Sequence, residues 1–316
     1  MASRLRDIVI GAGHLRQQVA FYSANLGLRA VAKGRIPPAL CSKLWGLDDS
    51  LDTVLMGRVD VPDAARLRLL RTSGLAARPD FDVTPPGPLG LVVDAVDPRR
   101  TYYRFSGAGV EFHAAPTGTG PDADAADRIG GDAEGESTER RVAYGRAYDG
   151  EYLVVEGPAL RGTPSPYFGV TEPHGCQIVV RDLAGASTFF DHVLEQRTIG
   201  AERRGGHAWE TAMGLRPGVT VTAQHLEADG GGFRTTLLAY SPSVGPAMDV
   251  QPPARGFCAL RFDVNALEAR LDLAQSLGAR LVSGPTWVEH PALGTGWAAS
   301  LMPGFGLLIE LWQSEA

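Results

Sequence analysis

Residues 7–28 read DIVIGAGHLRQQVAFYSANLGL, and residues 175–196 read GCQIVVRDLAGASTFFDHVLEQ. The two stretches align at a constant separation of 168 residues, which joins Phe21 to Phe189 and Leu26 to Leu194. The same separation relates Trp45-Gly46-Leu47 to Met213-Gly214-Leu215. A single shift that holds across a whole segment indicates an internal repeat.

A second pair of similar segments lies between and after the first pair. Residues 90–112 resemble residues 258–282, and Asp97 and Asn265 are again 168 residues apart. Each copy closes on a glycine-led apolar strand, at residues 147–157 and 303–312. The chain is therefore predicted to hold four copies of one small module.

The third copy shows the local pattern most clearly. Residues 177–180 have the apolar content of a strand, and Asp182 stands where a helix N-cap belongs. The residues that follow place one apolar stripe at spacings of three and four, as on an amphipathic helix: Ala186, Phe189, Phe190, Val193 and Leu194. Further strands complete each copy. We therefore predict an α+β fold of four βαβββ modules, paired into two half-open β-barrel-like domains with helices on the outside.

Linkers rich in proline and glycine divide these modules. The first half is predicted at residues 1–160, with modules at 5–72 and 87–160, and the second at residues 173–316, with modules at 173–241 and 254–313. Residues 116–141 are acidic, rich in glycine and poor in large apolar side chains. Such a segment buries too little surface to fold alone, so we expect a flexible insertion, either a disordered surface segment or a lid over a pocket.

Composition excludes several classes of protein. The net charge of -6 argues against nucleic acid as a partner, because phosphate binding needs clustered Lys and Arg. We find no apolar run long enough to span a membrane and no signal peptide. The three cysteines are far apart and predict neither a disulfide framework nor a zinc ribbon. A cytoplasmic location is the simplest interpretation.

Three of the quoted motifs resemble the vicinal oxygen chelate superfamily, which includes glyoxalases, bleomycin-resistance proteins and extradiol dioxygenases. They are HLRQQVAFYSANLGL at residues 14–28, RDLAGASTFFDHVLE at 181–195 and GLLIELW at 306–312. The resemblance covers nearly the whole chain. It implies that modules pair around a cavity and that a divalent metal is held by side chains of first and last strands.

The positions that correspond to the superfamily's metal ligands are poorly suited to a metal. In the first half they are Asp7, Gly90, Arg68 and Val154, and in the second half Gly175, Cys258, Thr236 and Glu310. An arginine cannot ligate a cation, and glycine and valine offer no ligand atom. We expect an ion pair between Arg68 and Asp7 to replace a metal in the first half. A divalent metal is disfavoured but not excluded, and the cofactor is otherwise unknown.

The second half therefore holds the candidate site residues. Glu310 matches a ligand position, and His174 lies one residue from another, so these two are the candidate metal ligands of an incomplete site. Glu310 and His225 are the candidate acid–base groups, because a histidine titrates near neutral pH. The candidate ligand-binding residues could donate hydrogen bonds or form aromatic walls: Gln177, Cys258, Trp209 and Trp297.

Three functions remain open at this point. The preferred one is an enzyme that acts on a small oxygen-rich or aromatic metabolite in the second-half cavity, by non-oxidative lyase or isomerase chemistry. The alternatives are a metal-dependent extradiol-type dioxygenase and a non-catalytic binding protein that sequesters a small molecule. The expected partner is a small-molecule ligand or substrate, with no nucleic acid and no membrane, and a homodimer is compatible with the sequence.

Overall fold

The structure is a computed structural model that describes residues 3–61, 64–76, 82–118, 140–157, 160–229, 231–242 and 248–314. Most of the predicted insertion, residues 119–139, lies outside the described residues, so its role as a lid or a disordered segment stays a prediction. Within the described part, no helix is long and apolar enough to cross a membrane.

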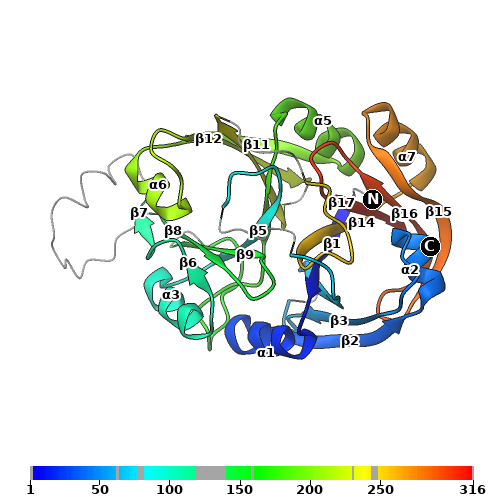
Figure 1. Cartoon of the computed structure of the whole chain (residues 1–316), viewed down its shortest axis with the longest axis horizontal. Coiled ribbons are helices and arrows are strands. Elements are labelled where there is room, and N and C mark those ends of the chain that lie inside the picture. Colours follow the sequence, from blue (N-terminus) through cyan, green and yellow to red (C-terminus); the bar gives the residue numbers. More distant parts are fainter. Residues whose placement is uncertain are drawn as a thin grey trace.

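Two curved sheets form the framework, and we call them the first and the second barrel (Figure 1). The eight-stranded sheet of the first barrel has the order β15 (Arg280–His290), β16 (Gly294–Met302), β17 (Leu308–Gln313), β14 (Gly256–Asp263), β1 (Arg4–Ala12), β4 (Arg66–Arg71), β3 (Leu51–Gly57) and β2 (Arg29–Ile36). The nine-stranded sheet of the second barrel has the order β11 (Gln196–Arg204), β12 (Thr220–Ala228), β13 (Arg234–Ser241), β10 (Gly175–Val179), β5 (Gly87–Asp94), β9 (Tyr152–Gly157), β8 (Arg141–Arg146) and β6 (Glu111–Phe112), and β7 (Thr117–Gly118) pairs with β8. The predicted α+β fold of paired modules is confirmed.

The pairing of the modules differs from the expected division into residues 1–160 and 173–316. The first barrel joins the first and fourth modules through the antiparallel pair β1–β14, and the second barrel joins the second and third modules through β5–β10. A Cβ on Gly11 would lie 1.9 Å from the carbonyl oxygen of Ala254, and one on Gly74 would lie 2.0 Å from that of Pro253. Only glycine lets the segment that leads into β14 approach the first module so closely.

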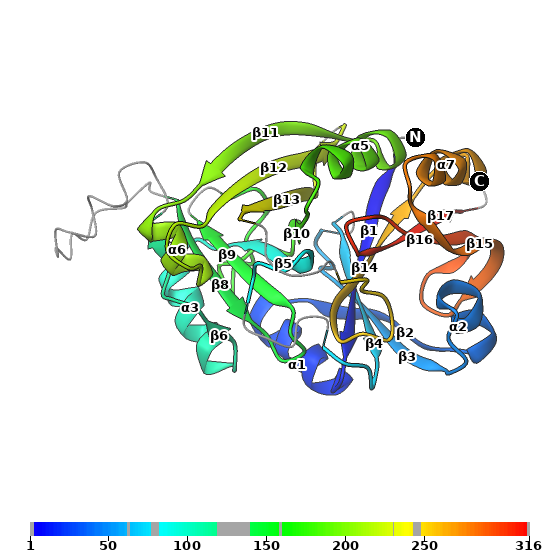
Figure 2. The same ribbon diagram turned by 45° about the horizontal axis from the view of Figure 1, so that its top comes forward.

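Consecutive modules instead meet through their helices. In Figure 2, α1 (Leu15–Leu26) and α3 (Pro98–Gly107) lie along one side, and α5 (Leu183–Leu194) and α7 (Leu267–Ser276) along the opposite side. Phe21 of α1 and Phe105 of α3 have ring centroids 6.1 Å apart, within the range of aromatic contact. One large apolar cluster covers the outer faces of both sheets and all four of these helices.

The sequence pattern of α5 explains why this helix forms and how it packs. The Asp182 carboxylate accepts a hydrogen bond from the Gly185 amide at 2.9 Å, as the predicted N-cap requires. All five residues of the predicted apolar stripe are buried. Each such large side chain contributes roughly 1.5–3 kcal/mol by leaving water, so packing stabilises α5 more than its cap does.

Two short helices occupy the concave faces of the barrels, and the sequence had not indicated them. They are α2 (Pro38–Trp45) in the first barrel and α6 (His207–Met213) in the second. Each ends at a glycine in the left-handed region, Gly46 with φ 69° and Gly214 with φ 65°, and these glycines are equivalent in the repeat. Trp45 and Trp209 project from these helices into the two interior apolar clusters.

Candidate functional site

The interior of the first barrel is closed by buried ion pairs. Arg68 of β4 forms an ion pair with Oε2 of Glu310 of β17, and the indole nitrogen of Trp45 donates to Glu310 Oε1 at 2.9 Å. The side chains of Arg68 and Glu310 are 0% and 1% exposed. Both carboxylate oxygens of the candidate acid–base group Glu310 therefore already have protein donors.

The expected ion pair between Asp7 and Arg68 is not formed. Asp7 instead bonds Arg261 of β14 at 2.9 Å, and the Arg261 guanidinium stands over the ring of Trp312 at 5.0 Å. The reason is the module pairing, because β14 borders β1 and places Arg261 directly opposite Asp7. Arg68 therefore pairs with Glu310, the carboxylate of the fourth module.

Cys258 and Trp297 also belong to the first barrel. Cys258 is fully buried and lies with Sγ 3.5 Å from the carbonyl oxygen of Val9. Burial raises the pKa of its thiol to about 12, so the thiol stays protonated and packs as a small apolar group. Trp297 is 44% exposed on β16 and contacts Trp287 edge-on. Neither residue is grouped with His225 or Gln177.

The described residues do not fit the metal that the superfamily resemblance implies. No group of three or more His, Cys, Asp or Glu side chains in the described ranges is arranged to hold an ion. At the corresponding positions of the first barrel, Glu310 is engaged by the guanidinium of Arg68, and a cation cannot share that carboxylate with a buried arginine without displacing it. We therefore derive no chemistry through a metal.

The concave face of the second barrel holds a different arrangement, centred on His225 of β12. Its Nδ1 lies 3.0 Å from the hydroxyl oxygen of Thr236 of β13, and its Nε2 lies 3.4 Å from Oε1 of Glu202 of β11. Residues 221 and 223 of the same strand belong to the interior apolar cluster, so His225 faces the interior by strand alternation. The result is a carboxylate–imidazole–hydroxyl relay.

Arginines hold Glu202 in its ionised form. The hydrogen bond with His225 lowers the pKa of Glu202, and the charges of Arg204 and Arg140 lower it further, which outweighs the opposing effect of burial. Arg204 Nε donates to Glu202 at 2.8 Å, and its guanidinium lies 4.5 Å from the ring centroid of Trp209. Glu202 remains 35% exposed, so the relay reaches solvent at this end.

Tyr144 and Gln177 extend the polar group deeper into the second barrel. The Tyr144 hydroxyl donates to Gln177 Oε1 at 3.0 Å and accepts from Arg204 Nη1 at 3.3 Å. Burial raises the pKa of Tyr144, so its hydroxyl keeps its proton and can donate. Gln177 Nε2 is buried and has no hydrogen-bond partner among the described residues. Three predicted residues, Gln177, His225 and Trp209, thus line one interior.

Glu156 and two arginines form the far end of this network. Arg140 Nη2 and Arg234 Nη2 each lie 3.1 Å from a carboxylate oxygen of Glu156. Burial acts to raise the pKa of Glu156, but the charges of Arg140, Arg234 and Arg204 prevail and lower it to about 2. Glu156 is therefore a fixed anion that positions arginines and does not exchange protons near neutral pH.

Sequence reasoning missed Glu202, Arg204 and Tyr144. Glu202 and Arg204 alternate along β11, QRTIGAERR, with their side chains on one face. Charged residues at alternate positions of a strand that precedes an apolar helix could have been the signal. Tyr144 lies on β8, which directly follows the insertion, and no motif marks this strand.

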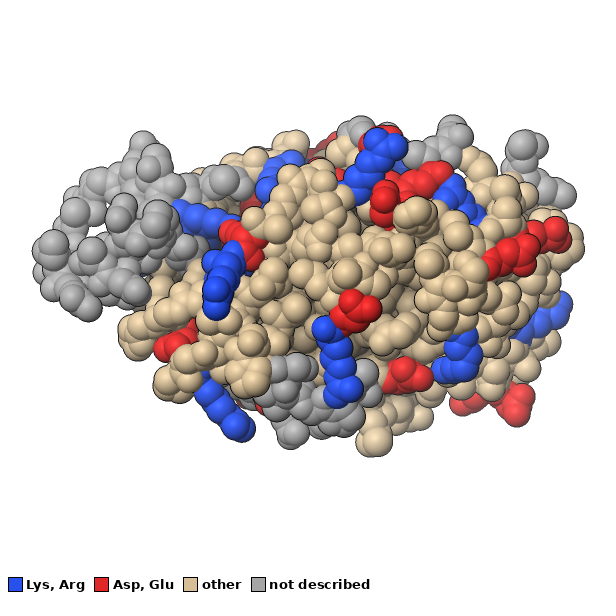
Figure 3. Space-filling model, turned by 90° about the horizontal axis from the view of Figure 1, so that it is seen from above, with Lys and Arg blue, Asp and Glu red and all other residues tan. Residues whose placement is uncertain are grey.

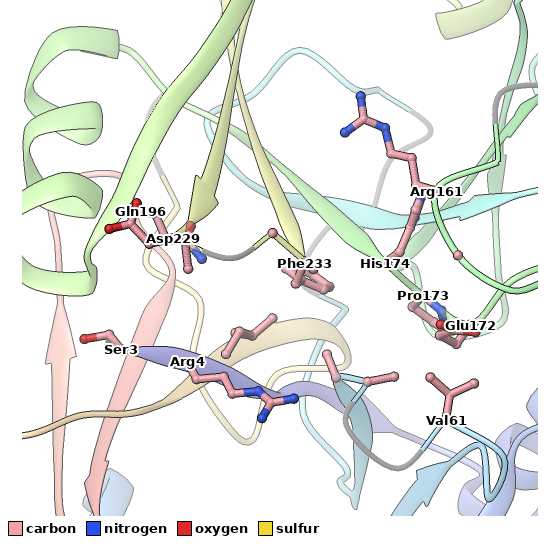
Figure 4. A pocket seen from close by; sticks show the side chains of 17 residues that line it. Ser3, Arg4, Val61, Arg161, Glu172, Pro173, His174, Gln196, Asp229 and Phe233 are labelled. Carbon is pink, nitrogen blue, oxygen red and sulfur yellow. The ribbon is translucent and has the colours of Figure 1, made fainter. Parts of the chain in front are cut away.

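His174 lies apart from both interiors, in a cavity of about 510 Å³ between the two barrels (Figure 4). Its Nδ1 is 3.2 Å from the carbonyl oxygen of Val92, and its Nε2 is 2.9 Å from Oδ2 of Asp94, without the alignment of a hydrogen bond. Burial lowers the pKa of His174 to about 4 and raises that of Asp94 to about 6. His174 and Glu310, the two candidate metal ligands, therefore occupy different parts of the molecule.

The fold of this chain, four modules paired into two curved barrels, is shared with solved structures of glyoxalase I. Among solved structures, glyoxalase I from Zea mays is similar over 99% of this chain and 92% of its own, with a TM-score of 0.63 and 14% identity. A Bacillus subtilis protein provisionally named as a dioxygenase is similar over 99% of this chain and 85% of its own, with a TM-score of 0.56 and 12% identity. No family model and no curated protein sequence matches the chain.

Proposed function

We propose that the protein is an acid–base enzyme that acts on a small oxygen-rich or aromatic metabolite inside the second barrel, by non-oxidative lyase or isomerase chemistry. The observation that carries this proposal is the relay of Glu202, His225 and Thr236 on the concave face. A histidine oriented by a carboxylate on one side and bonded to a hydroxyl on the other is arranged for proton transfer.

The direction of proton flow follows from the charge of Glu202. Because its pKa is lowered, this carboxylate is ionised and accepts, so it holds the His225 proton on Nε2. The Nδ1 lone pair is then directed at Thr236, whose hydroxyl donates to it. His225 can take the Thr236 proton as a base and return it as an acid. Thr236 is fully buried, so the transfer to a substrate requires the substrate to enter the interior.

The surrounding side chains suit a substrate with polar oxygens and a flat apolar part. Arg204 and Arg140 lie beside Glu202 and can stabilise negative charge that develops on a substrate oxygen. Trp209 belongs to the interior apolar cluster, which also contains Tyr152 and Tyr240. Aromatic walls with a few convergent polar groups are typical of small-molecule sites.

A second candidate function is sequestration of a ligand without turnover. It is favoured by the buried Nε2 of Gln177, which lacks a partner among the described residues and could donate to a ligand oxygen. Donation of this kind holds a ligand without moving any proton. The two candidates share a site and differ only in whether His225 exchanges a proton with the ligand.

Turnover of α-hydroxyketones, α-oxoaldehydes and hydroxylated aromatic acids, followed by NMR, tests the proposal. We expect one class to be converted without oxygen uptake, and His225→Gln to lower kcat by about 100-fold or more, the usual contribution of a general acid–base group. The matched control is His192→Gln, because His192 is an exposed helix residue outside the relay. Oxygen uptake, or activity lost on chelation and restored by a divalent metal, would support the dioxygenase alternative, and tight binding with unchanged ligand would support sequestration.

A further inference from the structure

The cavity between the barrels is built from segments that are distant in sequence. Its lining comes from the starts of β1 and β11, the segments before β4 and β10, the end of β12 and the residues just before β13. Figure 4 shows Ser3 and Gln196 on one side, His174 on the other and Phe233 between them. A volume of about 510 Å³ is in the range of small-molecule sites.

Two polar atoms that line this cavity are buried without a hydrogen bond from any described residue. They are the hydroxyl oxygen of Ser3 and Oε1 of Gln196, and these residues are 2% and 1% exposed. Nε2 of His174 also lacks an aligned hydrogen bond, but it lies 2.9 Å from Oδ2 of Asp94 and is not open to a ligand. Buried polar atoms are nearly always paired, so two such atoms on one side of a cavity point to an occupant.

The charges of the lining balance, which argues against an ionic occupant. Two cations, Arg4 and Arg161, face two anions, Glu172 and Asp229. Arg161 bonds Glu227 at 3.0 Å, and Glu172 bonds Arg58 at 3.0 Å. Asp229 lies 3.4 Å from Arg197. An ion would have to compete with these pairs, whereas a neutral ligand would not.

The kind of atom that lacks a partner defines the polar groups of the ligand. Oε1 of Gln196 can only accept, so the ligand must carry a hydroxyl or amine hydrogen there. His174 has a protein oxygen beside each ring nitrogen, the Val92 carbonyl 3.2 Å from Nδ1 and Asp94 Oδ2 2.9 Å from Nε2, so it offers no free acceptor to a ligand. The Gln196 side of the cavity thus presents the acceptor for a ligand hydroxyl.

The middle of the cavity is apolar. Leu5, Val61, Ala65, Pro173 and Phe233 contribute to the lining between the polar groups. We propose that this cavity is a second binding site, separate from the relay of the second barrel, for a neutral organic molecule with an apolar body and a hydroxyl group that donates to Gln196. The proposal goes beyond the proposed function and does not depend on it.

Because both barrels contribute to the wall, an occupant also joins them. Ser3 and Leu5 belong to the first barrel, whereas His174 and Phe233 belong to segments of the second. A ligand that binds only the folded protein stabilises it by mass action. The site therefore couples ligand binding to the contact between the two barrels.

Binding of para-benzenedimethanol, para-cyclohexanedimethanol and octanediol to the full chain, measured by calorimetry and by ¹H–¹⁵N NMR, tests this proposal. Terephthalate is the matched probe, since it has the shape of the first diol but carries two carboxylates. We expect at least one diol to bind saturably at millimolar concentration or below, with shifts at Gln196 and Phe233, and terephthalate to bind at least about tenfold more weakly.

Variants locate the binding. Gln196→Met removes the acceptor at similar size and is expected to weaken the diol by about fivefold to tenfold, the effect of one hydrogen bond. Ala65→Phe fills the cavity and should abolish binding, and His225→Gln should leave it unchanged. If no diol binds, if terephthalate binds as tightly, or if His225→Gln rather than Ala65→Phe removes binding, the proposal is wrong. Binding to Gln196→Met or Ala65→Phe is compared only where the NMR spectrum shows that the variant is folded. The chemical-shift changes that para-benzenedimethanol causes in the wild-type chain test the proposal without either variant.

Discussion

In the first barrel, Arg68 and Glu310 are 0% and 1% exposed and bond each other, whereas in the second barrel Glu202 and His225 are 35% and 12% exposed. Thr236 stands in the second barrel at the repeat position that Arg68 occupies in the first. A guanidinium there reaches across and neutralises the partner module's carboxylate. The shorter Thr236 side chain carries no charge and bonds the imidazole of His225 instead. The two interiors therefore differ at this repeat position, with a buried ion pair in the first barrel and a hydroxyl–imidazole contact in the second.

The face of the molecule seen from above does not distinguish the barrels by charge (Figure 3). On the face shown in Figure 3, basic and acidic side chains are interspersed. Charge of one sign is therefore not concentrated over either barrel on this face. The contrast between the two barrels lies in the buried charges of their interiors.

The largest expected effect is the loss of one partner of the buried pair in the first barrel. Arg68→Ala leaves the Glu310 carboxylate buried without its cation, which costs about 3–5 kcal/mol of unfolding free energy. Urea unfolding followed by fluorescence measures this loss. The double variant Arg68→Met, Glu310→Leu removes both charges and should lie within about 1–2 kcal/mol of the wild type. Equal instability of the single and double variants would show that shape rather than charge matters here.

A second prediction concerns Glu151, in the β8–β9 turn that contacts α1 of the first module. Its Oε1 accepts from Tyr22 at 2.8 Å and from Gln18 at 3.0 Å, and its Oε2 is buried without a partner among the described residues. Burial raises the pKa of Glu151 from 4.5 to about 7, and the charge of Asp149 acts in the same direction, against the hydrogen bonds from Tyr22 and Gln18. The junction between the modules therefore contains a carboxyl group that is protonated in mildly acidic solution.

The sign of the pH effect follows from proton binding. Between pH 4.5 and about 7 the folded protein holds a proton on Glu151 that the unfolded chain has lost, so stability falls as pH rises through this window. The total change is about 3 kcal/mol. Unfolding free energies at pH 4.5 and 8 should differ by that much more in the wild type than in Glu151→Gln, which cannot ionise. Parallel profiles for the two proteins would contradict the prediction.

The first barrel holds one buried and one exposed tryptophan, Trp45 and Trp297, whose contributions to stability can be compared directly. Trp45→Phe removes the indole donor to Glu310 and should cost about 2 kcal/mol, the range for a hydrogen bond to a charged group. Trp297→Phe affects a side chain that is 44% exposed and should change stability by less than about 0.5 kcal/mol. Chemical denaturation measures the free energy of unfolding of both variants. A similar loss at the two positions would show that the hydrogen bond to Glu310 contributes little.

The repeat in the sequence was enough to predict the α+β fold and, in each module, the strands and the helix that follows the first strand. It could not predict which modules share a sheet, because four equivalent copies offer equivalent first strands. The pairing depends on close backbone approaches such as that of Gly11 to Ala254, which a repeat does not reveal. The short helices α2 and α6 were missed because each lies within a segment where we expected only strands.

The candidate site was predictable in part. Three of the predicted residues, Gln177, His225 and Trp209, line the interior of the second barrel. Glu310 belongs to the other barrel, and the partner that orients His225 is Glu202, which carries no superfamily motif. Their contact depends on the register of β11 against β12, and a bulge between Thr198 and Gly200 shifts that register in a way the sequence does not show.

The smallest expected effect tests whether the second interior is built for stability or for a ligand. Tyr144→Phe removes one neutral hydrogen bond to Gln177 and should cost about 1 kcal/mol in urea unfolding. The same change leaves Gln177 without its donor and Arg204 with one acceptor fewer. The free energy of ligand binding should therefore change by more than the free energy of unfolding does. Tyr103→Phe is the matched control. It removes a hydroxyl from a side chain that is 71% exposed and should change neither the free energy of unfolding nor the ligand affinity. A stability loss at Tyr144 as large as that of Arg68→Ala would mean that both interiors are structural, and the contrast between the barrels would then be one of composition and not of function.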